Sequence, residues 1–348
     1  MSQSSDSPQQ QQQTPMVQGY WAHGRYYGSW KQGKYLCPID SEELNRLDLL
    51  HKFFLVARKG ALTSVNLDFG RPARIMDMGT GTGIWAIQVS DSQVMSRGEG
   101  GVTMTAVLTW HCRLRCIPEI MAIDINLIQP RLIPRGMVTM QFDIEEPSWD
   151  ALYCNCDLIF FRMLLGSIRT DKWPSVYRNA LEHLAPGTGY LEHVEIDWEV
   201  GFESSGEIPP NSAFKEWSET YLRGLDGFFR NARVRTQNTK RLLEEAGFCD
   251  IREQTIRCYV NPWSADPEEC DTARWFNMGI NIGLQAMSVA PLVEKLRWTV
   301  EEVKQLCERT FGRPGGLRLT RSPEFITHRH WGGRGGHGAF DEASLSVA

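Results

Sequence analysis

A glycine-rich run between an apolar segment and a helical one constrains this chain more than any other feature. The apolar segment is Arg74–Met78, and the run GTGTG at residues 79–83 follows it directly. Glycine lets the backbone adopt positive φ angles and approach a ligand closely, and a strand–turn–helix context is typical of a nucleotide-type site. Because open α/β sheets bind ligands at the carboxyl ends of their strands, we expect a binding site at this turn.

Beyond this run the chain alternates between strand and helix signals. Further strands are predicted at residues 119–124, 138–142, 157–161, 189–198 and 250–260, with helices at 84–90, 176–184, 239–246, 273–287 and 299–310. This alternation predicts a mostly parallel sheet that is covered by helices on both faces.

A helix is also predicted before the sheet, over residues 41–59. Asp40 is a favourable N-cap, Glu43 completes a capping box, and Gly60 ends the helix. The apolar residues between them recur at helical spacing, which predicts an amphipathic helix ahead of the main domain.

The chain divides into four parts. Residues 1–18 are rich in Gln and Ser and are predicted to be disordered, because they bury too little apolar surface to offset ordering entropy. Residues 19–72 hold an aromatic arm and the first helix, and the arm is predicted to pack on the domain or to form a lid. Residues 73–311 form the α/β domain. Residues 312–348 are rich in Gly and His, and we place no strand in them.

Composition excludes several classes of protein. With 42% hydrophobic and 23% charged residues the chain is neither fibrous nor wholly disordered, and no stretch of ~18 apolar residues could cross a membrane. The formal net charge of −5 argues against direct nucleic-acid binding through a basic face. The nine cysteines are odd in number and lack zinc-site spacing, so we expect reduced thiols and no metal.

The spacing of the glycines narrows the choice of ligand. Pyrophosphate binders favour G-x-G-x-x-G, and triphosphate binders carry a Lys after the glycines, whereas this chain has Gly at 79, 81 and 83 with Asp77 before them. The form D-x-G-x-G-x-G resembles motif I of class I methyltransferases, which bind S-adenosylmethionine. That ligand carries a cationic ammonium and a sulfonium, so it favours carboxylates and carbonyls over a basic cradle.

Further positions agree with this reading. Asp124 ends the second strand, where an acid would accept the ribose hydroxyls, and Asp143 follows the third strand, near an adenine. The fourth strand leads into Arg162, in a loop that would face donor and acceptor. The predicted cofactor-binding residues are Asp77, Gly79, Thr80, Gly81, Gly83, Asp124, Ile125, Asp143 and Arg162.

One spacing departs from expectation. Asp124 lies 41 residues after Gly83, whereas the ribose acid is expected ~20 residues after the glycine loop. The excess lies in residues 93–116, which we interpret as an atypical insertion: either a loop at the sheet edge or a translated intron.

The segments INLIQP, LEHVEIDWE and NPWSADP, together with the glycine run, resemble the LaeA-type methyltransferases of fungi from about Gly19 to Phe311. The resemblance implies a Rossmann-like class I fold with a mostly parallel seven-stranded sheet, its last strand left open here. It also implies an S-adenosylmethionine-dependent enzyme that regulates secondary metabolism, development and transcription with velvet-family proteins. A nuclear location follows from the resemblance, with a cytoplasmic pool as an alternative.

The catalytic residues and the methyl acceptor stay unassigned. On the fifth strand Glu192, His193, Glu195 and Asp197 are candidates, and the last three share one face by strand period. They either line an acceptor cleft or cap loops and pair with arginines. A loose basic cluster is predicted to be a solvated helix face rather than a nuclear import signal: Arg230, Arg233, Arg235, Lys240 and Arg241.

Two classes of function remain open. The first is an active methyltransferase whose acceptor is a protein, itself included, or a small molecule. The second is a methyltransferase-fold binding module, without catalysis or with weak catalysis, in a transcription-regulating complex.

Overall fold

The computed structural model describes residues 17–67, 71–95, 117–199, 212–311 and 324–331, and all structural statements concern these ranges. The predicted N-terminal tail up to residue 16, residues 96–116 of the insertion and most of residues 312–348 lie outside them.

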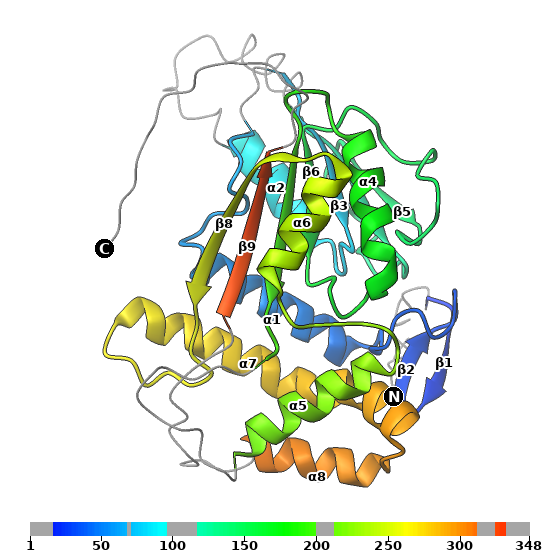
Figure 1. Cartoon of the computed structure of the whole chain (residues 1–348), viewed down its shortest axis with the longest axis vertical. Coiled ribbons are helices and arrows are strands. Elements are labelled where there is room, and N and C mark those ends of the chain that lie inside the picture. The colour runs from blue at the N-terminus through cyan, green and yellow to red at the C-terminus, as the bar shows by residue number, and fades with distance from the viewer. Residues whose placement is uncertain (1–16, 68–70, 96–116, 200–211, 312–323, 332–348) are drawn as a thin grey trace, which may run out of the picture.

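A seven-stranded sheet forms the centre of the protein (Figure 1). Its strand order is β5-β4-β3-β6-β7-β9-β8. The first five strands are parallel, and β9 runs antiparallel to both β7 and β8. Their bounds are β3 (Arg74–Met78), β4 (Glu119–Asp124), β5 (Met137–Gln141), β6 (Leu158–Arg162), β7 (Tyr190–Ile196), β8 (Cys249–Arg257) and β9 (Glu324–Trp331). The prediction of a mostly parallel sheet is confirmed.

The strand β9 lies where the sequence predicted none. Its backbone pairs with β7 from Tyr190↔Trp331 to Ile196↔Phe325, and with β8 on its other side. The segment EFITHRHW contains basic and imidazole side chains at consecutive positions, so it lacks the apolar alternation of a half-buried strand. It forms a strand because its backbone pairs with both β7 and β8. Such long-range pairing cannot be recognised from the local sequence.

Successive side chains of the central strands pack on opposite faces of the sheet, and each face has its own hydrophobic core. On β6, Phe160 packs in one cluster, whereas Phe161 packs in the other. Trp85, from α2 (Ile84–Met95), stacks on Phe160 with ring centroids 3.9 Å apart. Each such side chain contributes roughly 1.5–3 kcal/mol by burial.

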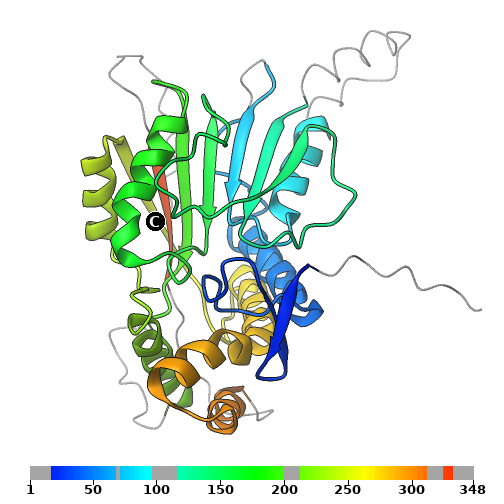
Figure 2. The same ribbon diagram turned by 90° about the vertical axis from the view of Figure 1, so that its right-hand side faces the viewer.

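Helices form two groups around the sheet (Figures 1 and 2). The helices α2, α4 (Trp173–His183) and α6 (Thr236–Ala246) flank the faces of the sheet. A second group forms a layer below the carboxyl ends of the parallel strands. This helical layer consists of α1 (Ser41–Ala57), α5 (Ala213–Asp226), α7 (Pro267–Val289), η2 (Ala290–Lys295) and α8 (Val300–Phe311). A short helix η1 (Thr170–Lys172) precedes α4.

The helix α1 begins as predicted but uses its cap differently. Asp40 accepts a hydrogen bond from the Glu43 amide at 3.2 Å, which is the N-cap contact. The Glu43 carboxylate does not complete the capping box; it accepts from Arg46 and from the Tyr35 hydroxyl instead. The helix ends at Ala57, two residues before the predicted end.

The aromatic arm is a hairpin followed by an irregular segment. Strands β1 (Gly19–Ala22) and β2 (Arg25–Gly28) pair antiparallel, and Arg25 binds Asp40 at 2.6 and 2.7 Å, which fastens the hairpin to the start of α1. The arm lies beside the helical layer, below the sheet (Figure 2).

Two features are absent from the described ranges. No helix there is long and apolar enough to cross a membrane. No cluster of three His, Cys, Asp or Glu side chains there could hold a metal ion, and the seven cysteines within these ranges are free thiols.

Candidate functional site

A cavity lies at the carboxyl ends of the parallel strands, between the sheet, the arm and the helical layer. Six of the nine predicted cofactor-binding residues line it: Gly79, Gly81, Asp124, Ile125, Asp143 and Arg162. They come from the ends of β3, β4, β5 and β6, so the parallel register of the sheet brings them together.

The glycine loop adopts the conformation that the sequence indicates. Gly79, Gly81 and Gly83 have φ angles of +73°, +59° and +79°, which residues other than glycine rarely adopt. A Cβ on Gly79 would lie 2.5 Å from Leu164 Cδ2, so the Leu164 side chain would have to shift to admit one. A Cβ on Gly81 would meet only Leu47 Cδ1, at 3.4 Å, so the constraint at Gly81 is conformational.

Three predicted residues support the loop without lining the cavity. Asp77 is buried and accepts a hydrogen bond from Thr80 Oγ1 at 2.5 Å, which ties the end of β3 to the loop. Burial raises the pKa of Asp77 to about 6, and the Thr80 bond opposes that shift. Gly83 directly precedes α2. A direct contact of these three residues with the cofactor stays a prediction.

Asp124 links the end of β4 to the glycine loop. Its Oδ2 accepts from the Gly81 amide and its Oδ1 from the Asn126 amide, both at 2.8 Å. Burial raises the pKa of Asp124 to about 6, against the effect of these backbone donors. Because a carboxylate oxygen can accept more than one hydrogen bond, Asp124 retains capacity for ribose hydroxyls.

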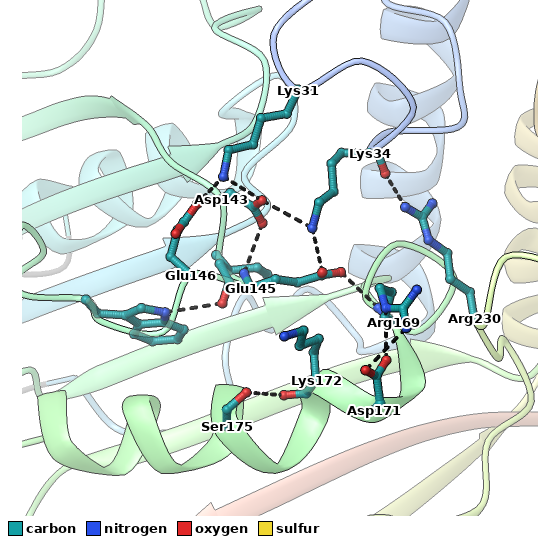
Figure 3. A network of polar contacts seen from close by, with 12 residues as sticks. Lys31, Lys34, Asp143, Glu145, Glu146, Arg169, Asp171, Lys172, Ser175 and Arg230 are labelled. Atoms are coloured by element: carbon teal, nitrogen blue, oxygen red, sulfur yellow. Dashed lines mark hydrogen bonds and ion pairs between the residues drawn. The ribbon is translucent and has the colours of Figure 1, made fainter.

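Asp143 lines the cavity, but two lysines of the arm bind its carboxylate (Figure 3). Lys31 Nζ and Lys34 Nζ lie 2.9 and 3.3 Å from Oδ2. Lys31 also pairs with Glu146, and Lys34 pairs with Glu145 at 2.6 Å. We call these five residues the arm latch. Although burial opposes ionisation, the hydrogen bond from Lys31 lowers the pKa of Asp143 below its usual value.

The arm therefore packs on the domain and also lines the cavity. After the hairpin, four consecutive arm residues line the cavity: Lys34, Tyr35, Leu36 and Cys37. The interpretation of the arm as a packed segment agrees with these contacts, whereas its interpretation as a lid stays a prediction.

Arg162 projects from the end of β6 into a polar group that sequence reasoning missed. Its Nη1 lies 3.1 Å from His51 Nδ1, and His51 Nε2 lies 2.9 Å from Gln88 Oε1. Because an arginine only donates, Nδ1 accepts and Nε2–H donates to the amide oxygen. Burial and the Arg162 charge lower the pKa of His51 to about 4, so this histidine is neutral near pH 7.

The candidates on the fifth predicted strand, β7, separate into two roles. Of the four, Glu195 lines the cavity. Its Oε1 accepts from the Leu164 and Leu165 amides at 2.6 and 3.0 Å, and lies 2.7 Å from His193 Nε2. The other ring nitrogen of His193 lies 3.1 Å from the Tyr177 hydroxyl.

The remaining two acids have structural contacts. Glu192, on the opposite face, pairs with Arg58 and accepts from Thr63 and Ser64. Asp197 accepts from the amides of Glu199 and Val234. Loop capping and pairing with an arginine are thus confirmed for Glu192 and Asp197, whereas a role of Glu195 or His193 toward a methyl acceptor stays a prediction.

The basic cluster is not one solvated face. Arg233, Arg235 and Arg241 pair with Asp226, Glu199 and Glu245. Lys240 is exposed, as predicted. The prediction is wrong for Arg230, which is 4% exposed and donates to the Lys34 carbonyl of the arm.

Comparisons with known proteins agree with this geometry. A family model described as a methyltransferase domain matches residues 47–253. The secondary metabolism regulator laeA of Fusarium oxysporum f. sp. lycopersici is 52% identical, over 84% of this chain and 85% of that protein. The regulator LAE1 of Hypocrea atroviridis is 45% identical, over 88% and 82%, and LAE1 of Cochliobolus heterostrophus is 34% identical, over 83% and 90%. The chain belongs to the LaeA/LAE1 family of methyltransferase-domain regulators.

Membership confirms the resemblance and the methyltransferase assignment drawn from the glycine loop. Other residues that line the cavity come from the helical layer and from the chain beyond β7: Arg46, Trp198, Tyr221, Leu225 and Met287. Sequence reasoning missed Tyr221 and Leu225 because α5 was not predicted, although its apolar residues recur at helical spacing from Phe214 to Leu225. Arg46, Trp198 and Met287 lie within predicted elements, but no motif there indicates a cavity.

Proposed function

We propose that this chain binds S-adenosylmethionine in the cavity and transfers its methyl group, and that it regulates secondary metabolism. The observation that carries the proposal is the bond between Asp124 and the Gly81 amide, because it joins the ribose acid and the glycine loop at one cavity wall. The names of the relatives, as regulators of secondary metabolism, support the regulatory role. Nuclear location, transcription regulation and velvet-family partners belong to the same proposal and rest on the family resemblance.

The residues present fit this cofactor. Asp124 would accept the ribose hydroxyls, and the backbone of Gly79 and Gly81 would lie along the methionine portion. Apolar Ile125, Phe142 and Ile144 line the part of the cavity nearest Asp143 and suit an adenine face. Arg162 supplies a positive charge for the methionine carboxylate. When bound, the cofactor supplies an electrophilic methyl group on a sulfonium.

The protein's own contribution is positioning. Methyl transfer is a displacement that depends on alignment of two reactants, and the buried contacts of Glu195 hold the loop after β6 in place. Met163 in that loop has φ +57°, a strained value for its type, and its amide donates to the Val194 carbonyl. An acceptor hydroxyl or amine in the cavity would meet the Glu195 carboxylate, which can take its proton.

A second candidate function is a binding module without catalysis. The arm latch favours it, because the Asp143 carboxylate engages lysines rather than remaining open toward an adenine. Catalysis requires bound S-adenosylmethionine, whereas a binding module can act without it.

Isothermal titration calorimetry with S-adenosylmethionine and S-adenosylhomocysteine tests the proposal. We expect wild type to bind both, and Asp124→Ala to lose about 3 kcal/mol of binding free energy, since two charge-assisted hydrogen bonds are removed. A wild-type chain that binds neither ligand contradicts the methyltransferase proposal. Pull-down of a velvet-family protein with wild type and Asp124→Ala then shows whether partner binding needs the cofactor.

A further inference from the structure

The guanidinium of Arg162 lies in the cavity wall without an ion pair. Arg162 ends β6, and its Cζ lies 5.2 and 6.0 Å from the ring centroids of Phe54 and Phe160. Asp77 acts on its charge without a hydrogen bond, and His51 is its one hydrogen-bond partner within the described ranges. Burial lowers the pKa of Arg162 to about 10, so the group is still charged near pH 7.

The four acids that line the same cavity have other partners. Backbone amides bind the carboxylates of Asp124 and Glu195. Lysines of the arm latch bind those of Asp143 and Glu145. None of the four makes a hydrogen bond or an ion pair with Arg162 in the part of the chain that the structure describes. A bound ligand can therefore form the first ion pair of this guanidinium.

A neutral side chain holds the guanidinium in place. Nη1 of Arg162 lies 3.1 Å from Nδ1 of His51, which is 2% exposed, and Nε2 of that ring lies 2.9 Å from Oε1 of Gln88. Because arginine only donates, Nδ1 carries no proton and the imidazole is neutral. A neutral acceptor fixes the direction of a guanidinium without cancelling its charge, whereas a carboxylate in the same place would do both.

We propose that His51, oriented by Gln88, is a positioning residue that directs Arg162 toward the methionine carboxylate of the cofactor, so that the site selects ligands with this carboxylate. Guanidinium–carboxylate hydrogen bonds are strong and specific in direction. The glycine loop follows β3, which pairs with β6 in the sheet, so the proposed place of the methionine portion adjoins the end of β6. This inference rests on the proposed function, and it assigns the control of one of its contacts to His51 and Gln88.

A purely structural role of the same cluster has a different consequence. His51 lies on α1, Gln88 on α2 and Arg162 on β6, so the cluster also joins three elements. If it did only that, removal of His51 would weaken every cofactor analogue alike. A positioning role weakens only ligands that carry the carboxylate, so the ratio of two affinities separates the roles.

The test measures this ratio. S-adenosylhomocysteine and decarboxylated S-adenosylhomocysteine are titrated by calorimetry into the full-length chain. We expect wild type to bind the first at least about tenfold more tightly, and Arg162→Gln to bind the two within about threefold. His51→Leu should also reduce the preference to about threefold, while its affinity for the decarboxylated analogue stays within about twofold of wild type, which shows that it folds.

Two further variants complete the design. His51→Asn keeps an oxygen acceptor near the place of Nδ1, so we expect it to regain most of the preference. His183→Leu is the matched control, because both ring nitrogens of His183 contact backbone carbonyls and this helical residue is outside the cavity lining. It should keep the preference of wild type.

Several outcomes overturn the inference. Equal binding of the two ligands by wild type, or an unchanged preference in Arg162→Gln, excludes the carboxylate contact. An unchanged preference in His51→Leu, equal weakening of both ligands, or no recovery in His51→Asn leaves His51 a structural role only. If His51→Leu does not fold, Gln88→Leu decides, since it leaves Nε2–H without its acceptor, and an unchanged preference there is equally contrary. A wild type that binds neither ligand contradicts the proposed function instead.

Discussion

The lining of the cavity is built in two different ways. One part, which we call the cofactor end, consists of strand ends and the short turns after them, so its residues follow one another along the chain as Gly79, Asp124, Asp143 and Arg162. Much of the remaining lining comes from α1, the arm and α5, which are far apart in sequence. A parallel sheet thus fixes the first part by register, whereas helix packing fixes the second. Selective damage to one part shows whether the two work separately.

The largest effect is expected at the glycine loop. Gly81→Val places a β-branched side chain at φ +59° beside Leu47, so we expect S-adenosylmethionine binding to fall below calorimetric detection. Gly60→Val is the matched control: Gly60 has φ +84°, open space around a Cβ, and no place in the cavity lining. Both variants carry similar backbone strain, so thermal denaturation should show similar losses. Wild-type affinity in Gly81→Val would contradict the assignment of the loop.

The next effect concerns Asp124. We expect Asp124→Ala to weaken S-adenosylmethionine about a hundredfold, which corresponds to about 3 kcal/mol. Asp124→Asn keeps one acceptor oxygen without the charge and should show an intermediate loss. The exposed Asp150 is the control, and Asp150→Ala should change affinity by less than twofold. Equal affinities of wild type and Asp124→Ala would move the ribose site to another acid.

The arm latch should have a smaller effect, on rates. Its ion pairs are partly exposed, so each contributes up to about 1 kcal/mol. We expect Lys31→Gln/Lys34→Gln to release the cofactor up to roughly tenfold faster in stopped-flow measurements, and high salt to have the same effect on wild type. Lys59→Gln removes an exposed pair with Glu268 and serves as the control. Unchanged release in the double variant would mean that the arm does not gate the cavity.

The smallest effect is the pH dependence of cofactor affinity. Because the pKa of Asp124 is raised to about 6, the carboxylate that the ribose needs is lost below that pH. Affinity should be constant above pH 7 and roughly fourfold weaker at pH 5.5. The raised pKa also means that the cofactor-free protein binds a proton more tightly than its unfolded chain. This contribution to stability is present at low pH and is lost as the pH rises through about 6. In Asp124→Asn the drop in affinity should be absent.

Six of the nine residues that the sequence predicted for the cofactor site line one cavity, because short motifs determine their positions. Glycines at positive φ and an acid at a strand end are local requirements, and the parallel register then places them together. The arm latch could not be predicted, since Lys31 and Asp143 lie 112 positions apart and neither segment contains a pattern that indicates a contact with the other. His51 was missed because a buried histidine on a helix resembles any other core position until Arg162 is placed beside it.

Arg230 shows a different limit. Arg230 belongs to a run of basic residues that indicates a solvated surface, and only the packing of the arm against the end of α5 buries it. Burial of this kind is a property of three-dimensional surroundings, so no residue pattern could report it.

The order of strands in the sheet also bears on synthesis at the ribosome. Within the described chain, β8 joins the sheet through β9 alone, and β9 follows α8. A nascent chain that ends at residue 311 can therefore assemble its five parallel strands and the cofactor end, while β8 has no strand with which to pair. Proteolysis of ribosome-stalled chains of increasing length should show protection of β3–β7 first and of β8 only once residues 324–331 have emerged. Completion of the sheet is then a late event, set by translation of β9 rather than by the helices before it.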